Sequence, residues 1–159
     1  MTQLYVIRHA IAAAKDPNQT DAARPLTAKG RRRWREAVKG AEHLGFRFDL
    51  LLHSPWLRAV ETAQELTRLV EGTTEVTDLL ARPPDPQLLG KLTGERIAVV
   101  GHQPWLGDLV GLLVFGHPEL GAHLELKRGS ILCLEGSVEP AGMTFTASLP
   151  PRVLRSVAG

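Results

Sequence analysis

The chain has 159 residues, of which 43% are hydrophobic and 23% are charged, so its composition is that of a soluble globular protein. The net charge of only +2 and the scattered basic residues argue against nucleic-acid binding. The one cysteine excludes an intrachain disulfide, and no apolar run is long enough to span a membrane. The length suits one domain over residues 1–159. Because Arg8 and His9 come too early for a secretory signal, we expect a location in the cytoplasm.

Apolar runs that alternate with helical patterns predict the secondary structure. Strands are expected at residues 3–8, 49–53, 96–101 and 130–135, with weaker candidates at 74–77 and 144–149. Helices are expected from Thr27 to about Leu44, from Pro55 or Trp56 to Val70, and from about Pro104 to Gly116. A long polar loop separates the first strand from the first helix at residues 10–26. The alternation predicts an α/β three-layer sandwich, with a mostly parallel central sheet and helices on both faces.

Basic side chains follow the predicted strands at the points where the strands end. Arg8 and His9 come directly after the first apolar run, and His102 comes directly after a later one. Arg58 lies just beyond the strand at 49–53, near a helix N-terminus that favours anions. In open α/β sheets, ligands bind beyond the carboxyl ends of the strands. We therefore expect these four side chains to share one site.

The chemistry of these side chains suits a phosphoryl group. Arginine offers a planar fork of donors and keeps its charge, so Arg8, Arg24 and Arg58 are candidates to bind phosphate. His9 is the candidate nucleophile, because a neutral imidazole nitrogen can attack phosphorus in line and form a covalent intermediate. His102 is the candidate donor to a phosphoryl oxygen. No cluster of histidine, cysteine and carboxylate residues has metal-ligand spacing, so neither a metal nor another cofactor is expected.

Four segments resemble motifs of the histidine phosphatase superfamily, which has the phosphoglycerate mutase-like fold. They are Val6–Ala10, Arg24–Gly30, Ser54–Ala63 and Gly101–Pro104. The short chain, with no large inserted cap, is most similar to the SixA-type phosphohistidine phosphatases. The resemblance implies that His9 is the phosphorylated nucleophile. The phosphate pocket that it implies consists of Arg8, Arg24, Arg58 and His102.

Two positions depart from the family pattern. Ala10 replaces the usual glycine after the histidine, and we expect it to add a Cβ beside the pocket. The glutamate that many relatives use as proton donor has no clear counterpart, so Asp85, the nearest carboxylate, is the possible general acid. General acid catalysis typically contributes about 10²–10⁴-fold, and an alkoxide needs it more than the imidazole of a phosphohistidine. The sequence therefore favours phosphohistidine in a protein as the substrate.

Two other functions stay open on the sequence alone. The chain could be a general phosphomonoesterase for small molecules, or a phosphoprotein-binding module without turnover. The expected partner is a phosphorylated protein or a small phosphorylated substrate, with neither nucleic acid nor membrane, and the small size favours a monomer. Arg24 could instead form an ion pair with Asp16 or Asp21. Trp56 and Trp105 follow the pocket motifs and could wall the pocket, but packing against the sheet is the default expectation.

Overall fold

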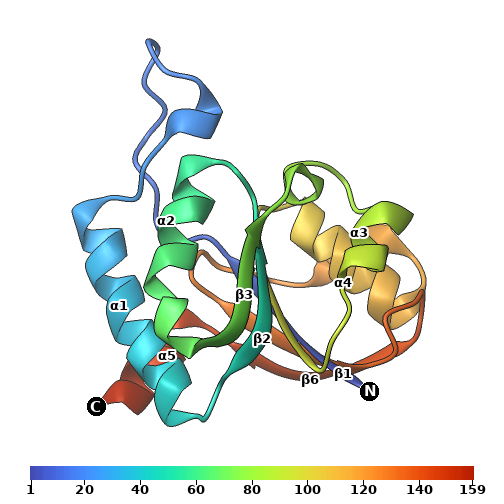
Figure 1. Cartoon of the computed structure of the whole chain (residues 1–159). Helices are drawn as coiled ribbons and strands as arrows, with labels where there is room; N and C mark the ends of the chain where they lie inside the picture. Colours follow the sequence, from blue (N-terminus) through green and yellow to red (C-terminus); the bar gives the residue numbers. More distant parts are fainter.

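The computed structural model describes residues 1–159 and contains one six-stranded sheet (Figure 1). The strands are β1 Thr2–Arg8, β2 Phe48–His53, β3 Val70–Val76, β4 Arg96–Gly101, β5 Ile131–Gly136 and β6 Met143–Leu149. Their order across the sheet is β3–β2–β4–β1–β5–β6. The pairs formed by β3, β2, β4 and β1 are parallel, whereas β5 is antiparallel to both β1 and β6. The sheet is therefore mostly parallel, as the sequence predicts.

Helices cover both faces of this sheet. The α-helices are α1 Ala28–His43, α2 Leu57–Glu65, α3 Pro86–Lys91, α4 Trp105–Phe115 and α5 Pro151–Ala158. Short 3₁₀ helices occur at η1 Asp21–Ala23, η2 Thr67–Leu69, η3 Asp78–Leu80 and η4 Pro118–His123. In Figure 1, α1, α2 and α5 lie on one side of the sheet, and α3 and α4 lie on the other. No helix combines the length and the hydrophobicity that a membrane span requires.

Each face of the sheet has its own hydrophobic core. In β1, Tyr5 and Ile7 join the core that also holds buried residues of α1, α2 and α5, whereas Leu4 and Val6 join the core under α3 and α4. This alternation follows from the two-residue period of a strand. Because both faces are covered, the central strands are continuous apolar runs, and this is the pattern by which the sequence predicts them.

The predicted first and third helices are confirmed together with their ends. Thr27 Oγ1 accepts a hydrogen bond of 2.8 Å from the Gly30 N–H and so caps the first turn of α1. At the end of α4, Gly116 adopts the left-handed conformation, with φ of 78°, which favours glycine.

The predicted second helix is wrong at its end. The α-helix stops at Glu65, and Val70, which we expected to be helical, begins β3. Tertiary pairing explains the difference, because the β-branched segment from Val70 to Val76 forms a parallel ladder with β2. The short helices α3 and α5 were not predicted, because six to eight residues carry too little periodicity.

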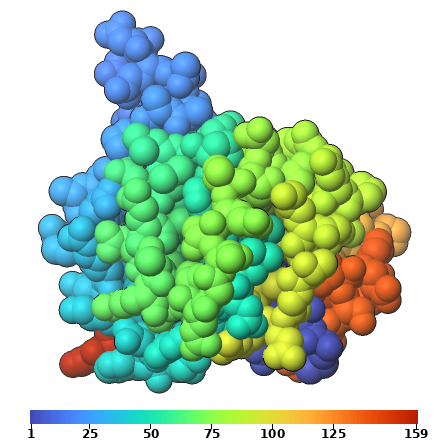
Figure 2. Space-filling model, viewed as in Figure 1, coloured from blue at the N-terminus to red at the C-terminus, as the bar shows by residue number.

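The segment between β1 and α1 projects from the body of the molecule, as Figure 2 shows. Ala12 and Leu26 form an antiparallel bridge at its base, and the Ala13 N–H donates to the Pro25 carbonyl at 2.8 Å. The predicted polar loop at residues 10–26 is therefore a folded projection, and its 3₁₀ helix η1 contacts α2 through Asp21.

The strand order brings three connecting segments to one edge of the sheet. The register aligns Arg8 with Gly101, so the next residues, His9 and His102, leave the sheet from neighbouring strands. Ser54 directly follows β2, which pairs with β4 on the side opposite to β1. All three strands are parallel, and their carboxyl ends form the edge where ligands bind in such sheets.

We predict that Gly40→Ala destabilises the fold. A Cβ at Gly40 in α1 would overlap the carbonyl oxygen of Leu154 in α5, so the two helices must move apart. The free energy of unfolding should fall by about 1–3 kcal/mol in urea denaturation followed by circular dichroism. Gly90→Ala in α3 is the control, because its Cβ would meet nothing within 4 Å, and its effect should be neutral or stabilising. Equal stabilities of the two variants would contradict the close packing of α1 and α5.

Candidate active site

A cavity of about 320 Å³ lies at this edge of the sheet, and we call it the His9 pocket. Most of its lining residues are basic or aromatic. They are Arg8, His9, Asp21, Arg24, Trp56, Arg58, His102, Gln103, Trp105 and Arg128. The structure thus brings together Arg8, His9, Arg58 and His102, the four residues that the sequence predicts to share a site.

His9 is buried and held in one tautomer by the backbone. Its Nδ1 lies 2.7 Å from the carbonyl oxygen of Ala10. Because a carbonyl oxygen only accepts, Nδ1 carries the proton, and Nε2 keeps its lone pair. Burial, together with the charges of Arg58 and Arg8, lowers the pKa of His9 to about 4, although the hydrogen bond to Ala10 raises it. The imidazole is therefore neutral near pH 7 and has a free nitrogen, which is the state that a nucleophile needs.

Arg8 and Arg58 converge on this imidazole with donors left over. Arg8 donates from Nη1 to the Leu126 carbonyl at 2.9 Å, and Arg58 donates from Nη1 to the Asp21 carbonyl at 2.7 Å. The Nε atoms of both arginines are buried without a hydrogen-bond partner. Buried donors of native proteins are rarely left unpaired, so these two indicate a site for an acceptor such as a phosphoryl oxygen.

His102 has a similar unpaired nitrogen, and Ser54 determines which of its nitrogens carries the proton. The backbone N–H of Trp56 donates to Ser54 Oγ at 3.1 Å, and Ser54 Oγ lies 2.7 Å from His102 Nε2. Ser54 is fully buried, and His102 Nε2 is the one acceptor to which its hydroxyl can donate. If the hydroxyl donates to Nε2, a neutral His102 carries its proton on Nδ1, which is buried and unpaired. Burial lowers the pKa of His102 to about 3, which supports the neutral form.

Two tryptophans form an aromatic wall of the His9 pocket. The ring of Trp56 lies 4.5 Å from that of His102 and 5.7 Å from that of Trp105, measured between centroids. The Arg58 guanidinium carbon lies 4.8 Å from the centre of the Trp56 ring, which is within the range of a cation–π contact. Of the two alternatives for Trp56 and Trp105, the structure supports the wall of the pocket, because both residues line it.

The structure places the two less certain candidates differently. Arg24 lines the His9 pocket and also forms an ion pair of 2.9 Å with Asp21, so both alternatives for this residue describe it. Asp85 is not a lining residue. Its carboxylate caps α3 by accepting from the Leu88 N–H at 2.9 Å, and this hydrogen bond lowers the pKa of Asp85. The prediction of Asp85 as a general acid is corrected, because a capping carboxylate of low pKa holds no proton to donate.

Ala10 also lies elsewhere than expected. Its side chain is buried in the hydrophobic core and does not line the His9 pocket, so its Cβ does not narrow the site. Its N–H donates to Thr62 Oγ1 at 3.0 Å, and the Thr62 hydroxyl donates to the Arg58 carbonyl at 2.7 Å. This chain of hydrogen bonds fixes the distance between the segment that carries His9 and the helix that carries Arg58.

Sequence reasoning missed Asp21 and Arg128 as pocket residues. Asp21 lies in η1 and forms an ion pair of 3.0 Å with Arg58, and its hydrogen bond with Arg24 is the main reason why its pKa is lowered. Arg128 lies in the segment before β5, and no apolar run ends directly before it. Neither residue has a sequence signal, because each enters the pocket from a loop. The structure contains no group of three or more histidine, cysteine or carboxylate side chains placed to hold a metal.

Comparison with known proteins identifies the family. Residues 4–81 match the family model of the histidine phosphatase superfamily (branch 1). An uncharacterized protein of Picosynechococcus sp. (strain ATCC 27264 / PCC 7002 / PR-6) is 32% identical over 151 residues, covering 83% of this chain and 84% of that protein. The family match and the fold are those of a phosphatase with histidine-based catalysis. The chain belongs to the histidine phosphatase superfamily.

Solved structures agree on the fold. The protein histidine phosphatase SixA complexed with tungstate superposes with a TM-score of 0.78 at 24% identity, covering 96% of this chain and 99% of that chain. The alpha-ribazole phosphatase from Shigella flexneri gives a TM-score of 0.70 at 17% identity, covering 94% and 97%. Phosphoserine phosphatase from Entamoeba histolytica, in complex with 3-phosphoglyceric acid, gives 0.68 at 17% identity, covering 97% and 100%. The similarity to SixA that the motifs indicate is therefore confirmed for the fold.

We predict that His9 stays neutral down to about pH 5 in the free protein. Its pKa of about 4 lies below the ordinary value of 6.5, so the unfolded chain binds more protons between these pH values. The free energy of unfolding should therefore fall as the pH falls from 6.5 to 4, and His102 adds to the same trend. Nitrogen-15 NMR of the His9 ring, assigned by difference from His9→Gln, measures the titration. A midpoint above pH 6 would contradict the account.

Proposed function

We propose that the protein is a phosphatase that forms a covalent phosphohistidine intermediate on His9, and that its substrate is phosphohistidine in another protein. The observation that carries the proposal is the state of His9, which is neutral and has a free Nε2. Unpaired buried nitrogens of Arg8, Arg58 and His102 line the same pocket. Such an arrangement suits in-line attack on a phosphoryl group.

In the first step, His9 Nε2 attacks phosphorus, and the bond between phosphorus and the substrate nitrogen breaks. The substrate ring enters with its second nitrogen protonated, so the electron pair of that bond leaves with a neutral imidazole. The phosphoryl group is now bonded to His9, whose ring carries the positive charge until the second step. Arg8 and Arg58 donate to the phosphoryl oxygens and stabilise their charge as it is redistributed. Nδ1 of His102 is the further donor in this scheme.

In the second step, water attacks phosphorus on the phosphorylated enzyme. The bond between phosphorus and His9 Nε2 breaks, its electron pair returns to Nε2, and the protons of water end on inorganic phosphate and the solvent. The hydrogen bond from Nδ1 to the Ala10 carbonyl keeps the ring in place through both steps. The products are phosphate and the neutral His9 with which the cycle began.

The His9 pocket has no protonated carboxylate, and this favours a substrate with a phosphorus–nitrogen bond over a phosphate ester. Asp21 is the only carboxylate that lines the His9 pocket, and its hydrogen bonds with Arg24 and Arg58 lower its pKa. It is therefore ionised at neutral pH and cannot protonate a leaving alkoxide. The imidazole of a phosphohistidine leaves more readily without such help, so the missing acid costs this substrate least.

A phosphomonoesterase for small molecules is the second candidate function. Phosphatases named for alpha-ribazole and phosphoserine share the fold, and a pocket of about 320 Å³ has the size of a small-molecule site. The binding-module alternative is weaker, because the side chain of Ala10 lies outside the pocket and leaves His9 accessible to phosphorus.

Two peptides that differ only at the phosphorylated residue, phosphohistidine in one and phosphoserine in the other, test the proposal. We predict that kcat/KM for the phosphohistidine peptide is higher by about 10²-fold or more, since only the ester needs a general acid. Labelled phosphate should be trapped on the wild-type protein, and His9→Ala should abolish trapping and reduce kcat by on the order of 10⁴-fold. His117→Asn, at an exposed position outside the pocket, is the matched control.

Each outcome points to one function. Faster hydrolysis of the phosphoserine peptide, or of small phosphate esters, would favour the second candidate. Full activity of His9→Ala would exclude His9 as the nucleophile and overturn the proposed mechanism.

A further inference from the structure

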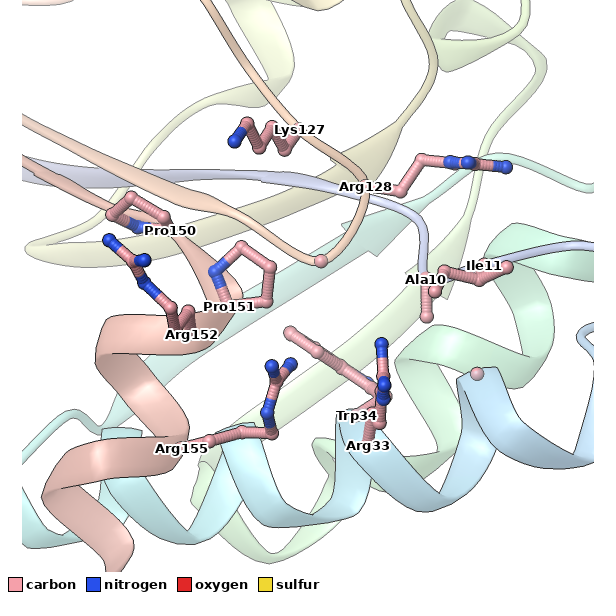
Figure 3. A pocket seen from close by; sticks show the side chains of 12 residues that line it. Ala10, Ile11, Arg33, Trp34, Lys127, Arg128, Pro150, Pro151, Arg152 and Arg155 are labelled. Carbon is pink, nitrogen blue, oxygen red and sulfur yellow. The ribbon is translucent and has the colours of Figure 1, made fainter.

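A second cavity adjoins the His9 pocket and is lined by cations. It has a volume of about 270 Å³ and lies between the first turns of α1, the first turns of α5 and the loop at residues 127–129. Its charged lining residues are Arg33, Lys127, Arg128, Arg152 and Arg155, and no carboxylate lines it. We call it the basic cavity (Figure 3).

The four arginines of the basic cavity lack the carboxylate partners that other arginines of the protein have, whereas Lys127 lies 3.8 Å from Glu125. Most arginines form ion pairs with carboxylates, such as Arg31 with Glu61 and Arg96 with Asp49. The arginines without an ion pair are Arg8, Arg32, Arg33, Arg128, Arg152 and Arg155. Four of these six line the basic cavity. With a net charge of only +2 for the whole chain, this local excess of like charge favours an anionic ligand.

The basic cavity is continuous with the catalytic region along the chain and through one side chain. Arg128 lines both cavities, and Ala10, which lines the basic cavity, directly follows His9. The positive charge of Arg128 also acts on His9 and Arg8, whose pKa values it lowers. Because the two cavities share the Arg128 side chain, they lie next to each other.

The arrangement of the cations suits an extended chain with several anionic groups. In Figure 3, Arg33 and Arg155 extend from neighbouring helices toward the loop, Arg128 leaves the loop on the side of Ala10 and Ile11, and Lys127 lies apart from them. The charges are thus distributed over three elements. Between them lie Pro150 and Pro151, whose half-buried rings are apolar surfaces for the carbon atoms of a peptide.

We propose that the basic cavity binds an acidic segment of the phosphorylated protein substrate, next to the residue whose phosphoryl group enters the His9 pocket. This inference rests on the proposed function. Arginine pairs with carboxylates through a planar fork of donors, and an extended peptide advances about 3.3–3.6 Å per residue. Aspartate or glutamate residues within a few positions of the phosphohistidine would therefore meet Arg33, Arg152 and Arg155.

Matched phosphohistidine peptides with acidic or neutral flanking residues test the inference. At low ionic strength, wild-type kcat/KM should be about tenfold higher for the acidic peptide, since each exposed charge pair contributes modestly. At about 1 M salt, where the screening length is about 3 Å, the difference should largely disappear. The triple variant Arg33→Gln, Arg152→Gln, Arg155→Gln should lose the preference and keep its activity on phosphoramidate, which is too small to reach the basic cavity while its phosphoryl group is at His9.

A charge-matched control separates this cavity from the net charge. The triple variant Lys29→Gln, Arg32→Gln, Lys39→Gln removes the same charge from exposed positions of α1 that do not line the basic cavity, and it should keep the preference. Arg152→Glu, at one exposed position, should reverse the preference without disturbing the core.

The outcomes distinguish this inference from the proposed function. Equal hydrolysis of both peptides by the wild type, or equal loss of preference in both triple variants, would overturn the inference and leave the function standing. A small bisphosphate that depends on the basic cavity as strongly as the acidic peptide would overturn the assignment to a peptide. No hydrolysis of either phosphohistidine peptide would overturn the proposed function, and the inference with it.

Discussion

The site depends on one imidazole that stays uncharged among cations. A histidine beside two guanidinium groups, buried from water, loses the proton that would block its lone pair. The Ala10 carbonyl then takes the remaining N–H, so the free nitrogen is Nε2. Burial and the arginine charges lower the pKa of His9 and outweigh the hydrogen bond to Ala10, which raises the pKa but fixes the tautomer. The arginines that would bind a phosphoryl group are also the groups that keep the nucleophile ready for it.

The fold maintains this arrangement through hydrogen bonds between segments that are far apart in sequence. Thr62 joins the N–H of Ala10 to the carbonyl of Arg58, and the Trp34 indole donates to the Thr62 carbonyl at 2.9 Å. Helices α1 and α2 and the end of β1 are therefore fixed to one another beneath the site. Such preorganisation matters because catalysis by fixed donors requires that they need not rearrange as the charge develops.

The sequence predicts the elements that carry the site better than it predicts their surroundings. Buried strands are continuous apolar runs, so the positions of Arg8, His9 and His102 at strand ends could be inferred. The order of the strands could not, because spacing along the chain does not say that β4 lies between β1 and β2. The resemblance to motifs of a known family implied that the ends of these strands converge on one site. The wrong end of the second helix has a similar origin, since only pairing with β2 makes Val70 a strand residue.

Residues in loops are the main part of the site that could not be predicted from the sequence. Asp21 and Arg128 reach the pocket through tertiary contacts that no periodic pattern announces, and the acid proposed at Asp85 proved to be a helix cap. The contact between the Ser54 hydroxyl and His102 likewise depends on the pairing of β2 with β4 and not on the local sequence. These residues differ from the predicted ones in a physical sense: their positions follow from packing between elements and not from the local chain.

A crystal structure of the protein with vanadate is the most direct test of the central claim. The account predicts vanadium bonded to Nε2 of His9, with vanadate oxygens accepting hydrogen bonds from Arg8, Arg58 and Nδ1 of His102. Vanadate bound away from His9, or a His9 ring turned so that Nε2 bonds to the protein, would contradict it.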